Sequence, residues 1–186
     1  MRKIILDLAV SLDGFIEGKN NDVDWIILDD EIGQDLSAFA DEIDTILYGR
    51  KSYEEYGNYV PDENATQSEK DFYQKVNKMR KFVFSKTVKS ISANVTLIND
   101  NIIDNINFIK QTTTKDIWIF GGASLITTLF NLNLIDEIRV GIHPIVLGAG
   151  NPLFKEIKER KKLNLVNTKV YQSGIAGLYY QLHRNE

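Results

Sequence analysis

The chain has 186 residues, of which 43% are hydrophobic and 26% are charged, and its formal net charge is −4. This length and composition predict one well-packed domain over residues 1–186. Because Lys and Arg do not outnumber Asp and Glu, nucleic acid is not expected as the main partner. The absence of cysteine excludes disulfides, thiol nucleophiles and thiolate metal sites.

The N-terminal segment and the two histidines bear on location and on metal binding. A basic start and a short apolar run open the chain, but Asp7 interrupts the run, so we predict a first strand and not a signal peptide. No apolar run approaches the roughly 20 residues needed to span a bilayer. His143 and His183 fall in separate strand-like segments and are interpreted as structural, so we expect no metal site. A cytoplasmic protein without a membrane partner is therefore expected.

Hydrophobic periodicity divides the chain into alternating strands and helices. Short apolar runs predict buried strands, and apolar residues spaced three and four apart predict helices. In chain order, the predicted elements are a strand at 3–10, a helix at 29–43, a strand at 45–48, a brief helix at 51–56, a helix at 67–79, strands at 81–85 and 95–98, a helix from 102 to near 112, a strand at 117–120, a helix after 122, a strand at 137–146, and a terminal hairpin of 163–171 and 178–183.

The order of these elements predicts an α/β fold. Strands alternate with helices through the first two-thirds of the chain, which calls for a largely parallel sheet with helices on both faces. The last third is rich in strands without long intervening helices, so antiparallel strands should close one edge. Ligands in such open sheets collect at the carboxyl ends of the parallel strands.

A phosphate-binding pattern follows the strand at 117–120. In DIWIFGGASLITTLF, at 116–130, a glycine pair joins the strand to an amphipathic helix. Gly121 and Gly122 lack a Cβ and allow close approach to the backbone, and the start of the helix offers unpaired N–H groups and the positive end of its dipole. A diphosphate would bind well there. Glycine pairs also occur where a chain simply turns, so this pattern alone leaves both readings open.

Two further strand ends carry cations and hydroxyls. They supply Gly49, Arg50, Lys51 and Ser52 in one segment and Ser85, Lys86 and Thr87 in the other, beside Gly121, Gly122, Ala123 and Ser124 in the glycine segment. Cations and hydroxyls hold phosphate oxygens through charge-assisted hydrogen bonds. Each cation taken singly could be a solvated charge on the rim, but the three strand ends together favour a ligand with phosphates at separated points, such as a dinucleotide with an extra 2′-phosphate.

These motifs resemble those of the dihydrofolate reductase-like family, in particular the branch similar to the reductase domain of bacterial riboflavin biosynthesis. The resemblance runs over nearly the whole chain and rests on the order and spacing of its motifs. The matching segments are AVSLDGFI at 9–16, Trp25 before the first long helix, GRKSYE at 49–54, FSKT at 84–87, GGASLITTLF at 121–130 and LYYQLHR at 178–184. It implies a three-layer α/β/α fold around a mixed, mostly parallel sheet.

The resemblance implies NADPH as the cofactor. Arg50 and Ser52 would contact phosphates, with Gly49 and Lys51 beside them, and Ser85 and Lys86, with Thr87, would lie near the adenosine 2′-phosphate. The diphosphate would bind to the segment of Gly121, Gly122, Ala123, Ser124 and Leu125. Ala9 would pack near the nicotinamide. Ser124 stands where many dihydrofolate reductases have a basic residue, so a preference for NADPH over NADH would depend on Lys86 and Arg50.

The substrate side is less well defined by the sequence. Counted from Trp25, Asp30 falls where dihydrofolate reductases place a carboxylate that faces the pterin, and it could favour protonation of the substrate. Asp30 could instead cap the helix or be solvated. Trp25 and Tyr53, together with Tyr56, are candidate aromatic residues of a substrate cleft, although such residues more often belong to a core.

The function implied is an NADPH-dependent oxidoreductase that transfers hydride to a small heterocycle, pterin- or folate-like or ribosylamino-pyrimidine-like. The alternative is a nucleotide-binding sensor or interaction module without turnover, since no obligatory catalytic residue stands out. A homodimer is expected under either reading, because sheet edges in small domains are often buried by a partner.

Overall fold

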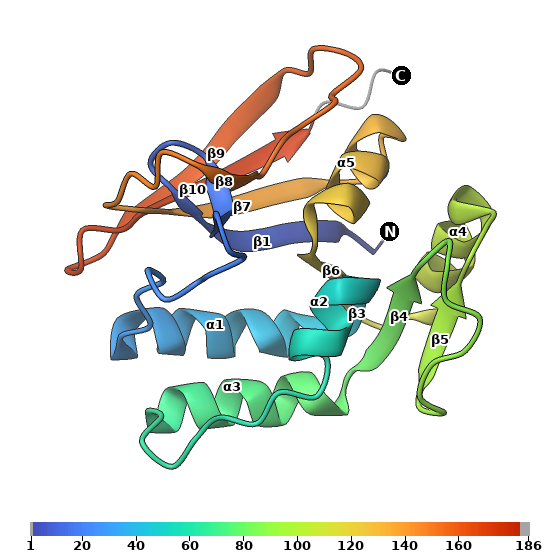
Figure 1. Ribbon diagram of the computed structural model, residues 1–186, viewed down its shortest axis with the longest axis horizontal. Helices are drawn as coiled ribbons and strands as arrows, with labels where there is room; N and C mark the ends of the chain where they lie inside the picture. Colours follow the sequence, from blue (N-terminus) through green and yellow to red (C-terminus); the bar gives the residue numbers. More distant parts are fainter. Residues whose placement is uncertain (1, 183–186) are drawn as a thin grey trace.

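An eight-stranded sheet forms the centre of the computed structural model, which describes residues 2–182 (Figure 1). The strands lie in the order β5-β4-β3-β6-β1-β7-β10-β9. Their bounds are β1 Ile4–Ser11, β3 Ile43–Gly49, β4 Arg80–Phe84, β5 Val95–Ile98, β6 Asp116–Gly121, β7 Glu137–His143, β9 Leu163–Val170 and β10 Ala176–Leu182. The first six strands of that order pair in parallel, whereas β10 pairs antiparallel with β7 and with β9. The predicted mixed, mostly parallel sheet with an antiparallel C-terminal edge is confirmed.

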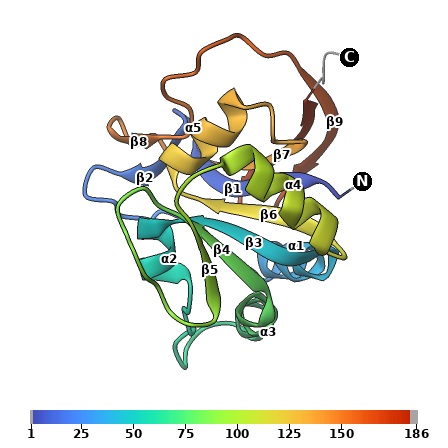
Figure 2. The same ribbon diagram turned by 90° about the vertical axis from the view of Figure 1, so that its right-hand side faces the viewer.

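Helices cover both faces of the sheet (Figure 2). Their bounds are α1 Asp30–Glu42, α2 Arg50–Tyr56, α3 Gln67–Lys78, α4 Ile102–Thr112 and α5 Ala123–Asn131. On one face, Phe39 of α1 and Phe72 of α3 pack with Trp118 of β6 in a buried cluster. On the other face, Ile106 of α4 and Leu129 of α5 belong to a second cluster. The sheet therefore separates two cores, and it is buried on both sides because its central strands are apolar on both sides.

Polar residues fix the starts of the two longest helices. Asp29 is the N-cap of α1, and its Oδ1 accepts a hydrogen bond from the backbone N–H of Ile32 at 2.9 Å. Thr66 caps α3 in the same way, accepting from the N–H of Glu69 at 3.2 Å. Each cap satisfies one of the N–H groups that the first turn of a helix leaves unpaired.

The structure differs from the predicted elements at the end of β7 and in two short additional strands. β7 ends at His143 and not at 146, because Pro144 cannot donate to the sheet. The short strands β2 Phe15–Gly18 and β8 Gly150–Pro152 form a separate antiparallel pair, where no element was predicted. Their three or four residues are too few for a periodic signal. The predicted last strand also reached His183, which lies outside the described residues.

Residues 2–182 contain neither a membrane-spanning helix nor a cluster of metal-binding side chains. None of the helices in that range combines the length and apolar character that crossing a bilayer requires. The same residues contain no group of three or more His, Asp or Glu side chains arranged to hold a metal ion.

Candidate active site

The carboxyl ends of β3, β4 and β6 open into one cavity of about 960 Å³, here called the basic cavity. The sheet register places these ends next to one another, since Gly49 pairs with Phe84 and Tyr48 pairs with Gly121. The predicted cofactor residues that line the basic cavity are Gly49, Arg50, Lys51, Ser52, Ser85, Lys86, Thr87, Gly122, Ala123, Ser124 and Leu125. The three strand ends that the sequence grouped together thus converge on a single space.

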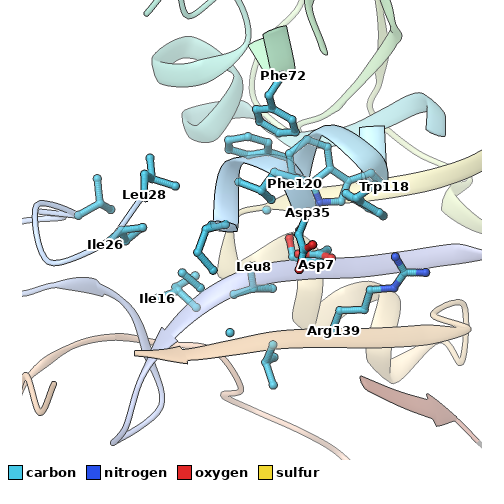
Figure 3. A pocket seen from close by; sticks show the side chains of 18 of the residues that line it. Asp7, Leu8, Ile16, Ile26, Leu28, Asp35, Phe72, Trp118, Phe120 and Arg139 are labelled. Carbon is cyan, nitrogen blue, oxygen red and sulfur yellow. Dashed lines mark hydrogen bonds between the residues drawn. The ribbon is translucent and has the colours of Figure 1, made fainter. Parts of the chain in front are cut away.

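A second cavity of about 660 Å³ lies beside it between α1 and the sheet, and its lining is mostly apolar (Figure 3). This apolar cavity includes Leu8, Ile16, Ile26, Phe72, Trp118 and Phe120, and it also receives the remaining two predicted cofactor residues, Ala9 and Gly121. Glu17, Ser52 and Gly122 line both cavities. The two spaces therefore meet at these three residues.

The backbone at this junction passes close to neighbouring atoms. A Cβ added to Gly122 would lie 3.1 Å from Ser52 Oγ, and one added to Gly49 would lie 3.1 Å from the backbone nitrogen of Gly122. Gly121 has a φ of +135°, a conformation that glycine adopts readily and L-residues rarely do. The Gly121–Gly122 peptide bond is cis. No side chain caps α5, whose first residues, Ala123 and Ser124, line the basic cavity. A glycine pair at an uncapped helix start fits an anionic ligand that needs backbone N–H donors.

The charged residues of the basic cavity are mostly cationic. Among the described residues that line it, the cationic ones are Lys19, Arg50, Lys51, Lys86 and Lys155, against the single carboxylate of Glu17. The guanidinium of Arg50 also contacts Glu54 at 2.7 Å on the exposed surface, an ion pair of the kind that contributes little to stability and can open for a ligand. After β4, Ser85 Oγ accepts hydrogen bonds from the N–H groups of Thr87 and Val88, which holds the Ser85–Thr87 turn at the cavity edge.

The apolar cavity carries carboxyl groups at its inner end. Asp7 on β1 and Asp35 on α1 both line it and point toward one another (Figure 3). Burial raises the pKa of Asp7 to about 7; Arg139 opposes this rise, while Glu42, Glu137 and Asp35 add to it. Such a carboxyl exists in both protonation states near neutral pH, as a group that exchanges a proton with a ligand must.

The predicted substrate residues do not line this cavity. Asp30 is exposed in the first turn of α1 and lines neither cavity, whereas Asp35, more than a turn further along the helix, faces the apolar one. Tyr53 is 5% exposed and packs edge-on against Tyr48 in the core. Trp25 lies outside both linings and packs edge-on against His143. The geometry therefore replaces Asp30, Trp25 and Tyr53 with other residues as candidates for contact with a substrate.

Sequence reasoning missed the groups that occupy the inner end of the apolar cavity. Asp7 was interpreted only as a break in an apolar run, and Asp35 was not among the predicted site residues. A carboxylate in the middle of an otherwise continuous buried strand was the available signal, because burial of a charge is costly without a function or a partner. Tyr56, the third aromatic residue considered, does line the cavity, as does His143, whose pKa is lowered by burial.

Known proteins resemble this chain in sequence and in fold. YyaP, an uncharacterized protein of Bacillus subtilis strain 168, is 50% identical over 179 residues, which cover 96% of this chain and 94% of YyaP. Among solved structures, a protein assigned to riboflavin biosynthesis from Shewanella sp. PV-4 superposes with a TM-score of 0.80 at 23% identity, covering 99% of this chain and 100% of that one. Dihydrofolate reductase from Enterococcus faecalis, complexed with NADP(H), superposes with a TM-score of 0.65 at 14% identity, covering 98% and 97%.

The structural likenesses establish a dihydrofolate reductase-like fold, as the sequence motifs implied. The family model of the RibD C-terminal domain matches residues 2–176. The chain therefore belongs to the RibD C-terminal domain family, a reductase-like family.

Proposed function

We propose that the protein is an NADPH-dependent reductase that transfers hydride to a small heterocyclic substrate, pterin- or folate-like or ribosylamino-pyrimidine-like. The observation that carries this proposal is the junction of the two cavities at Glu17, Ser52 and Gly122. A long ligand with phosphates at one end and a flat ring at the other matches a basic cavity that opens into an apolar one. Family membership and the NADP(H) bound by the Enterococcus dihydrofolate reductase support the same cofactor.

In this proposal the basic cavity holds the phosphates. The start of α5 and the glycine pair would receive the diphosphate, Arg50 and Ser52 would contact phosphate oxygens, and Lys86 would lie near the 2′-phosphate. These groups bind and orient, and they take no part in bond making.

The apolar cavity would take the nicotinamide and the substrate. When bound, the cofactor supplies the hydride, and the residues of the chain position the two rings and exclude water. Ala9 lies on the strand that lines this cavity and would pack near the nicotinamide. Aromatic side chains such as Trp118 and Phe120 provide flat apolar surface for a ring.

We further propose that the protein acts in the cytoplasm as a homodimer. β9 is the last strand of the sheet, and no other described strand pairs with its outer side. Its Leu165, Val166 and Val170 are 54%, 51% and 79% exposed. A long edge strand with exposed apolar side chains favours pairing with another chain. Sedimentation of the 21.2 kDa chain should give about twice its mass, and the mass of a single chain would contradict this proposal.

Lys86→Ala should weaken NADPH binding by about tenfold and leave NADH binding nearly unchanged, because only NADPH carries the 2′-phosphate that an ammonium would hold. Arg50→Ala should weaken both nucleotides if it contacts phosphates that the two share. Calorimetric titration of each variant with NADPH and NADH measures these differences directly.

Lys89→Ala is the matched control, since Lys89 is exposed on the same loop and lines neither cavity. Equal NADPH affinity in Lys86→Ala, Arg50→Ala and the unaltered protein would show that the phosphates bind elsewhere. Tight NADPH binding without oxidation across pterins and pyrimidines would instead favour the alternative function, a nucleotide sensor without turnover.

A further inference from the structure

The junction of the two cavities carries one carboxylate, that of Glu17. Glu17 belongs to β2 and lines both cavities, as Ser52 and Gly122 do. Among the described residues that line the basic cavity, it is the only Asp or Glu. A ligand that extends from one cavity into the other passes this carboxylate, and a phosphate group at that point would be repelled by it.

The backbone around Glu17 is held in place by its neighbours. β2 pairs antiparallel with β8, where Glu17 lies opposite Asn151 (Figure 2). The two strands approach closely, since a Cβ added to Gly150 would lie 2.1 Å from the carbonyl oxygen of Glu17. Directly after Glu17, the N–H of Gly18 donates to the carbonyl oxygen of Asp22 at 2.9 Å. The point from which the Glu17 side chain extends into the junction is therefore fixed.

The Glu17 carboxylate has an amide partner and no cationic one in the described part of the chain. Its Oε2 accepts a hydrogen bond from Asn151 Nδ2 at 3.0 Å. No lysine or arginine among residues 2–182 forms an ion pair with it, and its Oε1 accepts no hydrogen bond from those residues. A carboxylate only accepts hydrogen bonds and has room for about four of them, so most of this capacity is left for the donors of a ligand.

Two hydroxyl groups of α2 complete the junction. Ser52 lines both cavities, and Tyr56, at the end of the same helix, lines the apolar one. Burial raises the pKa of Tyr56 to about 12, and the charges of Glu55 and Glu17 add to this rise, so the charge of Glu17 acts on the Tyr56 hydroxyl. Tyr56 thus keeps its proton at neutral pH. An uncharged group that bears hydroxyls matches this combination of one carboxylate and two hydroxyls.

We propose that Glu17 binds the sugar hydroxyls of the nucleotide half that enters the apolar cavity and thereby sets how far the ligand reaches through the junction. This inference rests on the proposed function and adds a specificity residue to it. In a nicotinamide dinucleotide, an uncharged ribose separates the diphosphate from the ring, and its vicinal hydroxyls offer two donors to one carboxylate. A ligand displaced by one unit would place a phosphate beside Glu17. The role of Glu17 is to bind and position, without bond making.

Two fragments of NADPH isolate the contribution of this ribose. 2′-Phospho-ADP ends at the diphosphate, whereas 2′-phospho-ADP-ribose adds the second ribose without the nicotinamide. In the unaltered protein, we expect the added ribose to strengthen binding by about tenfold. In Glu17→Gln, which keeps the shape and removes the charge, this gain should fall to about threefold or less. The affinity for 2′-phospho-ADP should stay equal or rise, because a like charge has been removed. Calorimetric titration measures all of these affinities.

Controls separate this role from a structural one. Glu159→Gln, an exposed change outside both cavities, should leave the ribose gain unaltered. Loss of a purely structural contact between β2 and β8 would weaken both fragments equally. Glu17→Asp keeps the charge and withdraws it from the junction, so it should also reduce the ribose gain, and it replaces Glu17→Gln if that variant does not fold. A ribose gain unchanged in these variants, or no gain in the unaltered protein, would overturn the inference.

An NADPH titration of the same samples separates this inference from the proposed function. Binding of NADPH together with an unchanged ribose gain in the Glu17 variants would refute the role of Glu17 alone. A ribose gain that depends on Glu17, without oxidation of NADPH by any pterin or pyrimidine, would refute the reductase proposal and leave the sugar site standing. Absence of binding by NADPH and by both fragments would refute both.

Discussion

Gly122→Val should abolish NADPH binding, with a loss of at least about a hundredfold in affinity, while the protein still folds. The added Cβ would lie 3.1 Å from Ser52 Oγ, and Gly122 and Ser52 both line the two cavities. The two further methyl groups would extend into the space where the ligand must pass from one cavity to the other. Gly122 has a φ of −91°, which valine adopts without strain, so the fold should survive.

A graded series separates blockage of the site from general damage. Gly122→Ala should weaken NADPH binding less than Gly122→Val does. When Ser52→Ala removes the hydroxyl, adding Gly122→Ala in the double variant should lower the NADPH affinity by a smaller factor. Ala93→Val, on an exposed turn outside both cavities, is the matched control. Calorimetry gives the affinities and circular dichroism checks the fold. NADPH affinity in Gly122→Val equal to that of the unaltered protein would mean that the junction is not part of the binding path.

Asp44→Ala should lower the free energy of unfolding by about 2–3 kcal/mol without changing NADPH affinity. Asp44 Oδ2 accepts from the N–H of Thr114 at 2.8 Å, from its hydroxyl at 2.7 Å and from the N–H of Lys115 at 3.0 Å, and Oδ1 accepts from the hydroxyls of Thr45 and Thr113. These bonds tie the start of β3 to the loop before β6, at the end of the sheet opposite the cavities.

The pH dependence of the free energy of unfolding tests the hydrogen bonds of the Asp44 carboxylate independently. Burial would raise the pKa of Asp44, but the hydrogen bonds from Thr113, Thr114 and Thr45 outweigh it and hold the pKa below its usual range. A lowered pKa in the folded state stabilises the protein above the unfolded value of about 3.9, and this stabilisation is lost as the pH falls further.

Urea unfolding at neutral pH and at about pH 3 should therefore show the stability gap between the Asp44→Ala variant and the unaltered protein narrowing at the lower pH. Asp104→Ala, an exposed change in the first turn of α4, should give a gap of less than about 0.5 kcal/mol at either pH. A gap for Asp44→Ala that stays constant with pH would contradict the assigned hydrogen bonds.

The parallel part of the fold and the convergence of the three strand ends could be predicted from the sequence. Buried strands in α/β proteins are short continuous apolar runs. A glycine at the end of such a run indicates where the strand turns, so Gly49 and Gly121 indicate the ends of their strands. Parallel pairing then brings these ends together whatever the details of packing. β2 and β8 were missed because strands of three or four residues carry no periodic pattern.

The inner end of the apolar cavity could not be predicted in the same way. Which carboxylate of the first helix faces the sheet depends on the rotation of α1, and Asp29, Asp30, Glu31 and Asp35 all lie within two turns. Counting from Trp25 selected Asp30. In the structure Asp29 caps α1, and the rotation of the helix about its axis turns Asp35 toward the apolar cavity. Asp35 and Asp7 come from α1 and β1, and only the packed structure places both at the apolar cavity (Figure 3).

Mapping of backbone amide shifts with two ligands tests the central claim, that one ligand spans both cavities through Gly122. NADPH should shift the amides of Ser52, Gly122 and Ala123 in the basic cavity and also those of Leu8 and Ala9 in the apolar one. Adenosine 2′,5′-bisphosphate, which lacks the nicotinamide, should shift only the first group. Shifts from NADPH that leave Leu8 and Ala9 unmoved, or that map away from Gly122, would contradict the account.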